Sequence, residues 1–466
     1  MQTSKSKLSW ILFSIPPLLL IILVVFFDFH GLYGQDSYAY LDATIEIKEW
    51  LKTGGNMSPF YWPKGYPTIG ALISLTGLPE RWSLQLISLL SFVGTLYLLR
   101  QIIKSISDVD PTLFLLLAAG TQVYFLRAGI LCMSDMFACF MLTLVVFYYF
   151  KGFHSKRWQH WILCLVCAGI AFFTRYVAPL IVVPLIAHLF FRLISPWKVY
   201  QKVLVLLAGI SAGACVVLLN NNIVENGIQV IGNWNPMNII SRDLVSDSGI
   251  SHHWVPNGLY VFGNFGHIGF MSIGVLLIPF YKRIKQSQIP LFISVVIYLL
   301  FLAGIWTQNY RFLVLSHPFV LMLLYPAFLR LSAWLKQRKV FSVFIIGVLL
   351  FNTVFFVYSF KKMYTVFNNE KRISNALKDL NDDSIIYTFY VDQSFKANGI
   401  DNEVRNLYLE DYEYFESGSL VVYNEIEFAS QWDDTQLSDN WTELTENYEL
   451  EIIEEFSNNW TIYRIR

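Results

Sequence analysis

Residues 30–43 read HGLYGQDSYAYLDA and follow directly on an apolar run over residues 8–27. A helix needs roughly 20 apolar residues to cross a bilayer. The stretch therefore places two carboxylates, Asp36 and Asp42, and three tyrosines where a membrane helix emerges into water. Lysines precede the apolar run, and it lacks a small-residue cleavage site, so we predict a retained span rather than a removed signal peptide.

The composition of the whole chain agrees with a membrane protein. Of its 466 residues, 55% are hydrophobic and 15% are charged, and the mean hydropathy is +0.47. A soluble domain carries about 25% charged residues. The chain is therefore expected to be a polytopic α-helical membrane protein.

The apolar runs predict about eleven spans separated by short polar breaks. They cover residues 8–27, 82–103, 112–126, 134–150, 159–174, 177–195, 201–219, 259–281, 288–305, 312–334 and 340–360.

Alternation of these spans can be tested with the positive-inside bias, because lysine and arginine stay on the cytoplasmic side. If the spans alternate in direction, six basic clusters lie on the same side of the membrane as the N-terminus. These are Lys5 and Lys7, Arg100 and Lys104, Lys151 with Lys156 and Arg157, Arg192 with Lys198 and Lys202, Lys282 with Arg283 and Lys285, and Lys336 with Arg338 and Lys339. We therefore predict a cytoplasmic N-terminus and an extracytoplasmic C-terminus.

Two domains are expected. Residues 1–362 form the membrane domain, with external loops at 28–81 and 220–258. Residues 65–79 are apolar but too short for a span, which favours a helix along the outer surface. Residues 363–466 carry 22 acidic against 7 basic residues. Their mixed pattern predicts a small α/β domain, with a helix in KRISNALKDL and strands in SIIYTFYV, SLVVYNEI, YELEIIEEF and NNWTIYRI.

The motif content excludes several enzyme classes. The chain has no Walker loop, no G-x-G-x-x-G, no G-x-S-x-G and no H-E-x-x-H. Cys164 and Cys167 form a C-x-x-C inside a span, where packing is the expected role. The pair His252 and His253 has no third ligand at a suitable spacing. The acidic residues of the C-terminal domain are expected to form a solvated surface without a catalytic constellation.

Several short motifs share one arrangement along the chain. GQDSYAYLD (34–42) follows the first span, and FYWPKGYP (60–67) leads into the surface helix. RAGILCMSDMF (127–137) enters the fourth span, and TRYVAP (174–179) and NYRFLVLSHP (309–318) follow later spans.

This arrangement resembles the GT-C superfamily of membrane glycosyltransferases, in its bacterial branch related to protein O-mannosyltransferases and lipid A aminoarabinose transferases. The resemblance implies that Asp36 is the catalytic base, that Asp135 is a second acidic site residue and that Lys64 holds the donor phosphate. From its position alone, Asp135 is equally consistent with a polar helix cap beside Ser134. Many members carry two adjacent acidic residues where this chain has Gln35 and Asp36, so metal binding is left open, and a divalent cation is the one cofactor considered.

Cations at the outer ends of spans fit a donor phosphate, since arginine binds phosphate bidentately and lysine binds it as a point charge. Lys64, Arg127, Arg175 and Arg311 are the candidates, with contact to lipid head groups as the alternative. The aromatic residues of the motifs are the candidates for substrate binding: Tyr38, Tyr40, Trp62, Tyr66 and Tyr310.

The expected function is transfer of a sugar, with inversion, from a polyprenyl-phosphate donor to an acceptor hydroxyl on the extracytoplasmic side. The expected partners are that donor, a lipid, glycan or protein acceptor, and membrane lipids, but no nucleic acid; the expected location is the bacterial inner membrane. A lipid or glycolipid transporter is the alternative, although the charges gather at one membrane face rather than at mid-span. A scaffold whose C-terminal domain binds a partner is a third reading.

Overall fold

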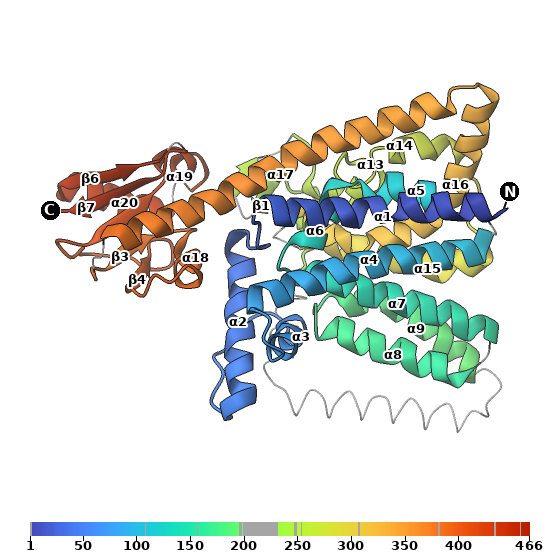
Figure 1. Cartoon of the computed structure of the whole chain (residues 1–466), viewed down its shortest axis with the longest axis horizontal. Coiled ribbons are helices and arrows are strands. Elements are labelled where there is room, and N and C mark those ends of the chain that lie inside the picture. Colours follow the sequence, from blue (N-terminus) through green and yellow to red (C-terminus); the bar gives the residue numbers. More distant parts are fainter. Residues whose placement is uncertain are drawn as a thin grey trace.

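The computed structural model describes residues 2–107, 109–155, 157–194, 198, 232–246, 249–252, 254–305, 308–380, 383–432, 435–456 and 458–466. Figure 1 shows a bundle of long helices with a small sheet-containing domain beyond one end. The N-terminus lies at the opposite end of the bundle from this domain.

The helices of the bundle follow the apolar runs of the sequence. α7 packs on α4 and α8, and α15 packs on α9. Among the described residues, six helices are long and apolar enough to cross a membrane, or seven if one bent pair counts as a single span. The six are α1 (Gln2–Phe26), α4 (Glu80–Ser107), α7 (Ser134–Ser155), α15 (Ile289–Gly304, with the preceding turn), α16 (His317–Gln337) and α17 (Phe341–Leu380). The apolar helices α8 (Trp158–Phe172) and α9 (Ala178–Ile194) are shorter.

α17 is longer than a bilayer is thick. Its 40 residues extend for about 60 Å at 1.5 Å per residue, against a hydrocarbon core of about 30 Å. Its first half is apolar, and charged residues begin at Lys361. The C-terminal half therefore leaves the membrane and leads into the small domain, and the helix predicted over 371–380 is its last part.

The predicted span 112–126 is bent rather than straight. It consists of α5 (Thr112–Leu115), a π-helical turn η1 (Leu116–Gly120) and α6 (Val123–Ile130), with a bend of 78°. A Cβ atom on Gly120 would lie 2.7 Å from Cγ of Pro16. The glycine thus lets η1 approach α1 closely at the bend.

The predicted span 259–281 is not one helix but four short segments: η2 (Asn257–Phe262), α13 (Gly263–Gly266), α14 (Gly274–Leu277) and η3 (Ile278–Phe280). Glycines recur through this run and weaken a helix. At Gly274 a Cβ atom would lie 1.7 Å from the carbonyl oxygen of Phe265, so the chain folds back on itself there. The predicted span 201–219 lies outside the described residues, as does part of the loop 220–258.

The remaining short elements connect the helices of the bundle. They are α12 (Pro236–Ile240), the antiparallel pair β1 (Asp243–Ser246) and β2 (Gly249–His252), η4 (Gln286–Gln288) and η5 (Tyr310–Val314).

The first external segment, which is predicted from the sequence to be a loop, contains a long helix. α2 (Gly34–Thr53) lies across the end of the bundle. Its buried residues Ser37, Leu41, Thr44 and Ile47 recur at helical spacing. α3 (Gly65–Ser74) packs on α2 and α4, in the place predicted for the surface helix.

The C-terminal domain has a five-stranded sheet in the order β4-β3-β5-β7-β6. β4, β3 and β5 are parallel, and β7 pairs antiparallel with β5 and β6. The four predicted strands correspond to β3, β5, β6 and β7. The elements are β3 (Ile386–Thr388), α18 (Asp392–Ala397), β4 (Val404–Asn406), β5 (Leu420–Tyr423), α19 (Glu425–Gln431), α20 (Gln436–Asn447), β6 (Leu450–Glu455) and β7 (Thr461–Ile465).

These elements confirm the predicted fold class, a helical membrane protein with a small C-terminal α/β domain. The bundle and the domain have separate hydrophobic cores. The domain boundary predicted between residues 362 and 363 falls inside α17, which is continuous there. No break in the chain marks this boundary, so it stays a prediction.

Candidate active site

Asp36 lies in the first turn of α2, where the turn before the helix fixes its position. Gly34 begins the helix with a φ of +67°. The hydroxyl of Ser37 accepts a hydrogen bond from the backbone amide of Tyr33 (2.6 Å) and donates one to the carbonyl of Gly34 (2.9 Å). The positive end of the helix dipole favours a carboxylate at this site.

Arg311 reaches Asp36 from a distant part of the chain. Its guanidinium group donates a hydrogen bond to the Asp36 carboxylate, and its Nη1 lies 3.5 Å from the sulfur of Met133. The side chain of Asn309 accepts a hydrogen bond (3.0 Å) from the backbone amide of Arg311 at the start of η5. The predicted base and one predicted phosphate ligand are thus in direct contact.

A second ion pair joins two more predicted site residues. Asp135, in the first turn of α7, is only 2% exposed, and its carboxylate accepts a hydrogen bond from Arg175. The guanidinium carbons of Arg175 and Arg311 lie 5.7 and 5.5 Å from the ring centre of Phe312. Two arginine–aspartate pairs therefore flank one aromatic ring.

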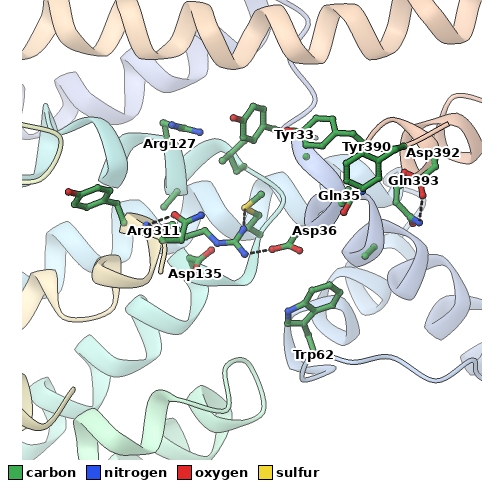
Figure 2. Close-up of a pocket in the computed structure, with 18 of the residues that line it drawn as sticks. Tyr33, Gln35, Asp36, Trp62, Arg127, Asp135, Arg311, Tyr390, Asp392 and Gln393 are labelled. Atoms are coloured by element: carbon green, nitrogen blue, oxygen red, sulfur yellow. Dashed lines mark hydrogen bonds and ion pairs between the residues drawn. The ribbon is translucent and has the colours of Figure 1, made fainter. Parts of the chain in front are cut away.

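Two cavities meet at the pair formed by Asp36 and Arg311. The first has a volume of about 740 Å³ and the second about 820 Å³. Asp36, Trp62 and Arg311 line both cavities. Of the other predicted residues, the first cavity contacts Arg127, Asp135 and Tyr310, and the second contacts Arg175. Figure 2 shows the charged groups of the first cavity around Asp36.

The two cavities are bounded by different elements. The second is bounded by apolar side chains of α15 and its C-terminal end, Phe301, Leu302 and Ile305, together with Trp234. The first is bounded by polar groups of the bundle and by the C-terminal domain. Asp36 therefore stands between a space beside α15 and a space beside the C-terminal domain.

Three of the predicted substrate-binding tyrosines line neither of these cavities. The hydroxyl of Tyr38 donates a hydrogen bond to Oε2 of Glu370 (2.6 Å). The hydroxyl of Tyr40 bonds with that of Ser134 (2.8 Å), and that of Tyr66 donates to the carbonyl of Leu84 (2.9 Å). All three side chains are buried. In this structure they attach α2 and α3 to the bundle and to α17 rather than lining either of the two cavities at Asp36.

Lys64 is also outside the lining of both cavities. It stands directly before α3, and its carbonyl accepts a hydrogen bond from the hydroxyl of Thr68 (2.7 Å). Its neighbours Trp62 and Pro63 line the second cavity. The predicted contact between Lys64 and the donor phosphate stays a prediction.

One side of the first cavity is not predicted from the sequence. Eight residues of the C-terminal domain line the cavity together with Asp36. Besides Phe389 and Leu409 they are six residues, hereafter the C-terminal wall: Tyr390, Asp392, Gln393, Asn406, Tyr408 and Trp432. Figure 2 shows Tyr390, Asp392 and Gln393 on the other side of Gln35 and Asp36 from Arg311. These residues come from separate segments, so no local motif marks them.

The described residues contain no group of three or more His, Cys, Asp and Glu side chains able to hold a metal ion. Asp36 and Asp135 are instead each paired with an arginine. His252 contacts Asp243 (2.7 Å), and His253 lies outside the described residues. We therefore assign no step to a metal.

Comparisons with known proteins concern the family and the fold. Residues 65–219 match the family model described as dolichyl-phosphate-mannose-protein mannosyltransferase. No curated protein matches the chain at a significant level.

Two crystal structures of ArnT from Cupriavidus metallidurans have a similar fold. The apo structure aligns with a TM-score of 0.57 and 14% sequence identity, covering 98% of each chain. The structure bound to undecaprenyl phosphate aligns with a TM-score of 0.60 and 12% identity, covering 97% of each chain. The resemblance to GT-C membrane glycosyltransferases is thus confirmed: the chain has the ArnT fold over nearly its whole length and, in residues 65–219, the sequence pattern of the dolichyl-phosphate-mannose-protein mannosyltransferase family.

Proposed function

We propose that this protein transfers a sugar from a polyprenyl-phosphate donor to an acceptor hydroxyl, with inversion, on the extracytoplasmic side of the membrane. The observation that carries the proposal is the pair formed by Asp36 and Arg311, which lines both cavities. In this proposal Asp36 is the base that acts on the acceptor, and Arg311 is the cation that binds the donor phosphate. The two must lie side by side where acceptor and donor meet.

The second cavity suits the donor. Its apolar side chains, Phe301, Leu302 and Ile305, can contact a polyprenyl chain, while Arg175 and Arg311 face the same space and can bind the phosphate. A lipid phosphate is the ligand seen in one ArnT structure, and the matched family is described by a dolichyl-phosphate donor. Both relatives support a polyprenyl-phosphate donor here.

Donor binding would also activate the base. A phosphate at Arg311 competes with the Asp36 carboxylate for the same guanidinium group, and phosphate is a bidentate partner of arginine. The carboxylate of Asp36 is then released towards the first cavity. In this mechanism the base becomes available only when the donor is in place, which limits unproductive chemistry.

The transfer is a single displacement. The acceptor oxygen forms a bond to the anomeric carbon while the bond between that carbon and the phosphate oxygen breaks, and Asp36 takes the hydroxyl proton. The phosphate leaves with the electron pair as a stable anion, so no general acid is needed. Arg311 and Arg175 stabilise its charge. Attack opposite the leaving group inverts the anomeric configuration, and no second nucleophilic carboxylate is used.

The proposed orientation is supported by the two ends of the bundle. Asp110 joins the N-terminal parts of α1 and α5 to the end of α4, through Ser9 Oγ (2.7 Å) and Arg100 Nη2 (3.0 Å). The ends of α1 and α4 that carry basic clusters therefore lie together, which is typical of a cytoplasmic face. Asp36 of α2 lines both cavities, and α2 lies at the end of the bundle that faces the C-terminal domain (Figure 1).

The function can be tested with purified protein and a panel of radiolabelled polyprenyl-phosphate sugars, using a membrane extract as the acceptor source. We expect label from one donor to move into the lipid, glycan or protein fraction. The anomeric configuration of the product should be opposite to that of the donor. Retained configuration would contradict the single displacement, and no transfer with any donor by folded protein would contradict the proposed function.

A further inference from the structure

The C-terminal wall lies where open α/β sheets commonly bind ligands. Tyr390, Asp392 and Gln393 follow the carboxyl end of β3, and Asn406 and Tyr408 lie at and after the carboxyl end of β4. The chain passes from β3 to β4 on one side and then to β5 on the other side of β3. Ligands of such sheets bind outside the carboxyl ends of the parallel strands, at the point where the strand order reverses.

The backbone at the wall is strained. Tyr390 is a non-glycine residue with a φ of +74°, in the left-handed region that costs a residue with a side chain about 1 to 3 kcal/mol. The conformation occurs at the turn between β3 and α18. The strained residue is thus itself one that lines the cavity. Backbone strain commonly occurs at binding sites.

Hydrogen bonds fix the polar side chains of the wall relative to one another. Oδ2 of Asp392 accepts hydrogen bonds from Asn406 (3.0 Å) and Gln393 (3.2 Å). The other carboxylate oxygen, Oδ1, is buried and has no hydrogen-bond partner among the described residues. A carboxylate with two side-chain amides offers both donors and acceptors, which is what a hydroxyl-rich ligand requires.

An aromatic surface adjoins these polar groups. The ring of Phe389 lies 5.1 Å from that of Tyr408 and 5.2 Å from that of Trp432, and the latter two lie 5.0 Å apart. Tyr408 remains 36% exposed. Flat rings beside amides and a carboxylate suit a ligand that has both an apolar face and hydroxyl groups, such as a sugar ring.

The charges on the two sides of the cavity differ. The wall contains a carboxylate and no lysine or arginine, whereas the bundle side contributes Arg127 and Arg311. The domain is acidic as a whole. The wall therefore disfavours a phosphate group, which is better placed at the arginines.

The wall is also attached to the helix that carries Asp36. Lys396 of α18 lies 3.4 Å from Asp42 of α2, and Glu370 in the C-terminal half of α17 accepts the hydrogen bond from Tyr38. From this geometry we propose that the C-terminal wall binds an uncharged sugar ring of the acceptor, so that the C-terminal domain completes the active site and selects the acceptor. That the sugar belongs to the acceptor rests on the function proposed above.

The test uses the full-length protein in detergent and saturation-transfer difference NMR. The probes are three uncharged disaccharides (maltose, lactose and N,N′-diacetylchitobiose), with glucose 1-phosphate as the charged comparison. We expect saturation transfer to at least one uncharged sugar and a smaller effect on the phosphate. The double variant Gln393→Ala, Tyr408→Ala should weaken that binding about tenfold or abolish it.

Tyr414→Ala is the matched control, because Tyr414 is 64% exposed in the same domain and does not line the cavity. It should bind the sugar as the unmodified protein does, and all variants should share one melting temperature. No saturation transfer to any of the sugars in folded protein, or equal transfer in the double variant, would overturn the proposal.

The same variants separate this proposal from the proposed function. If Asp36→Asn abolishes sugar transfer while the double variant binds and transfers normally, the wall is not an acceptor site but the function stands. If sugar binding depends on the wall and yet no polyprenyl-phosphate donor supports transfer, the function is wrong and the wall remains a sugar site. Transfer that is lost in Asp36→Asn, together with sugar binding that is weakened in the double variant, would support the two proposals.

Discussion

Asp36 and Arg311 are 275 residues apart in the sequence and form an ion pair at the meeting point of the two cavities. A short turn before α2 positions the carboxylate, and Asn309 positions the arginine. Because a donor phosphate would compete for this arginine, the pair links donor binding to the activation of the base.

Arg311→Gln should lower kcat by about 10² to 10³, the typical cost of removing one charge-stabilising donor from an active site. Arg311→Lys should recover only part of this loss, since lysine cannot bind phosphate bidentately. Steady-state kinetics with varied donor concentration would measure both changes. Arg338→Gln, an exposed arginine at the end of α16, is the control, and equal effects at the two positions would contradict the assignment.

Arg175 should stabilise the fold through Asp135. In Arg175→Gln the buried Asp135 carboxylate loses its partner, and breaking a buried ion pair costs about 3 to 5 kcal/mol. The melting temperature should therefore fall clearly. Adding Asp135→Asn removes the uncompensated charge and should restore most of the stability, but transfer should stay low because the phosphate ligand is still missing. Recovery of activity in the double variant would show that the pair is only structural.

Glu370 provides a pH-dependent contribution to stability. It lies in the part of α17 beyond the membrane and is 1% exposed. Burial raises its pKa to about 8, and the hydrogen bond from Tyr38 opposes the rise. Folded protein thus keeps a proton that the unfolded chain, with a pKa near 4.5, has lost at neutral pH. The free energy of unfolding should therefore fall by up to about 1.4 kcal/mol per pH unit between these two values.

Glu370→Gln should remove that slope. Melting temperatures of the two proteins measured from pH 5 to pH 8 should converge at the acidic end and separate at the basic end, with the variant more stable at pH 8. Parallel curves over the whole range would mean that Glu370 is ionised in the folded protein as it is in the unfolded chain.

The sequence predicts the long spans of the bundle because each is a nearly continuous apolar run, as in α4 and α7. It does not predict α2, whose buried face alternates with charged residues such as Glu46 and Lys48. The stretch 259–281 has the hydropathy of a span, but its glycines allow a close chain reversal at Gly274. Hydropathy reports burial in lipid, not the continuity of a helix.

The candidate site is predictable only in part. The motifs singled out Asp36, Asp135, Arg175 and Arg311, yet their pairing depends on how distant helices pack. Tyr38, Tyr40 and Tyr66 stand in the same motifs and support the helices instead. The C-terminal wall escapes prediction because it is assembled from the ends of separate strands and from a helix end. Its one acidic residue, Asp392, is indistinguishable in the sequence from the other carboxylates of an acidic domain, and only the folded sheet places it on the cavity.

The most direct test of the account is the transfer of radiolabelled sugar from a polyprenyl-phosphate donor by Asp36→Asn protein. Glu49→Gln is the matched control, since Glu49 lies exposed on the same helix and lines neither the first nor the second cavity. We expect Asp36→Asn to lose about 10² to 10⁴ in rate, the usual contribution of a general base, while both variants stay folded and Glu49→Gln keeps its activity. Undiminished transfer by folded Asp36→Asn protein would contradict the account.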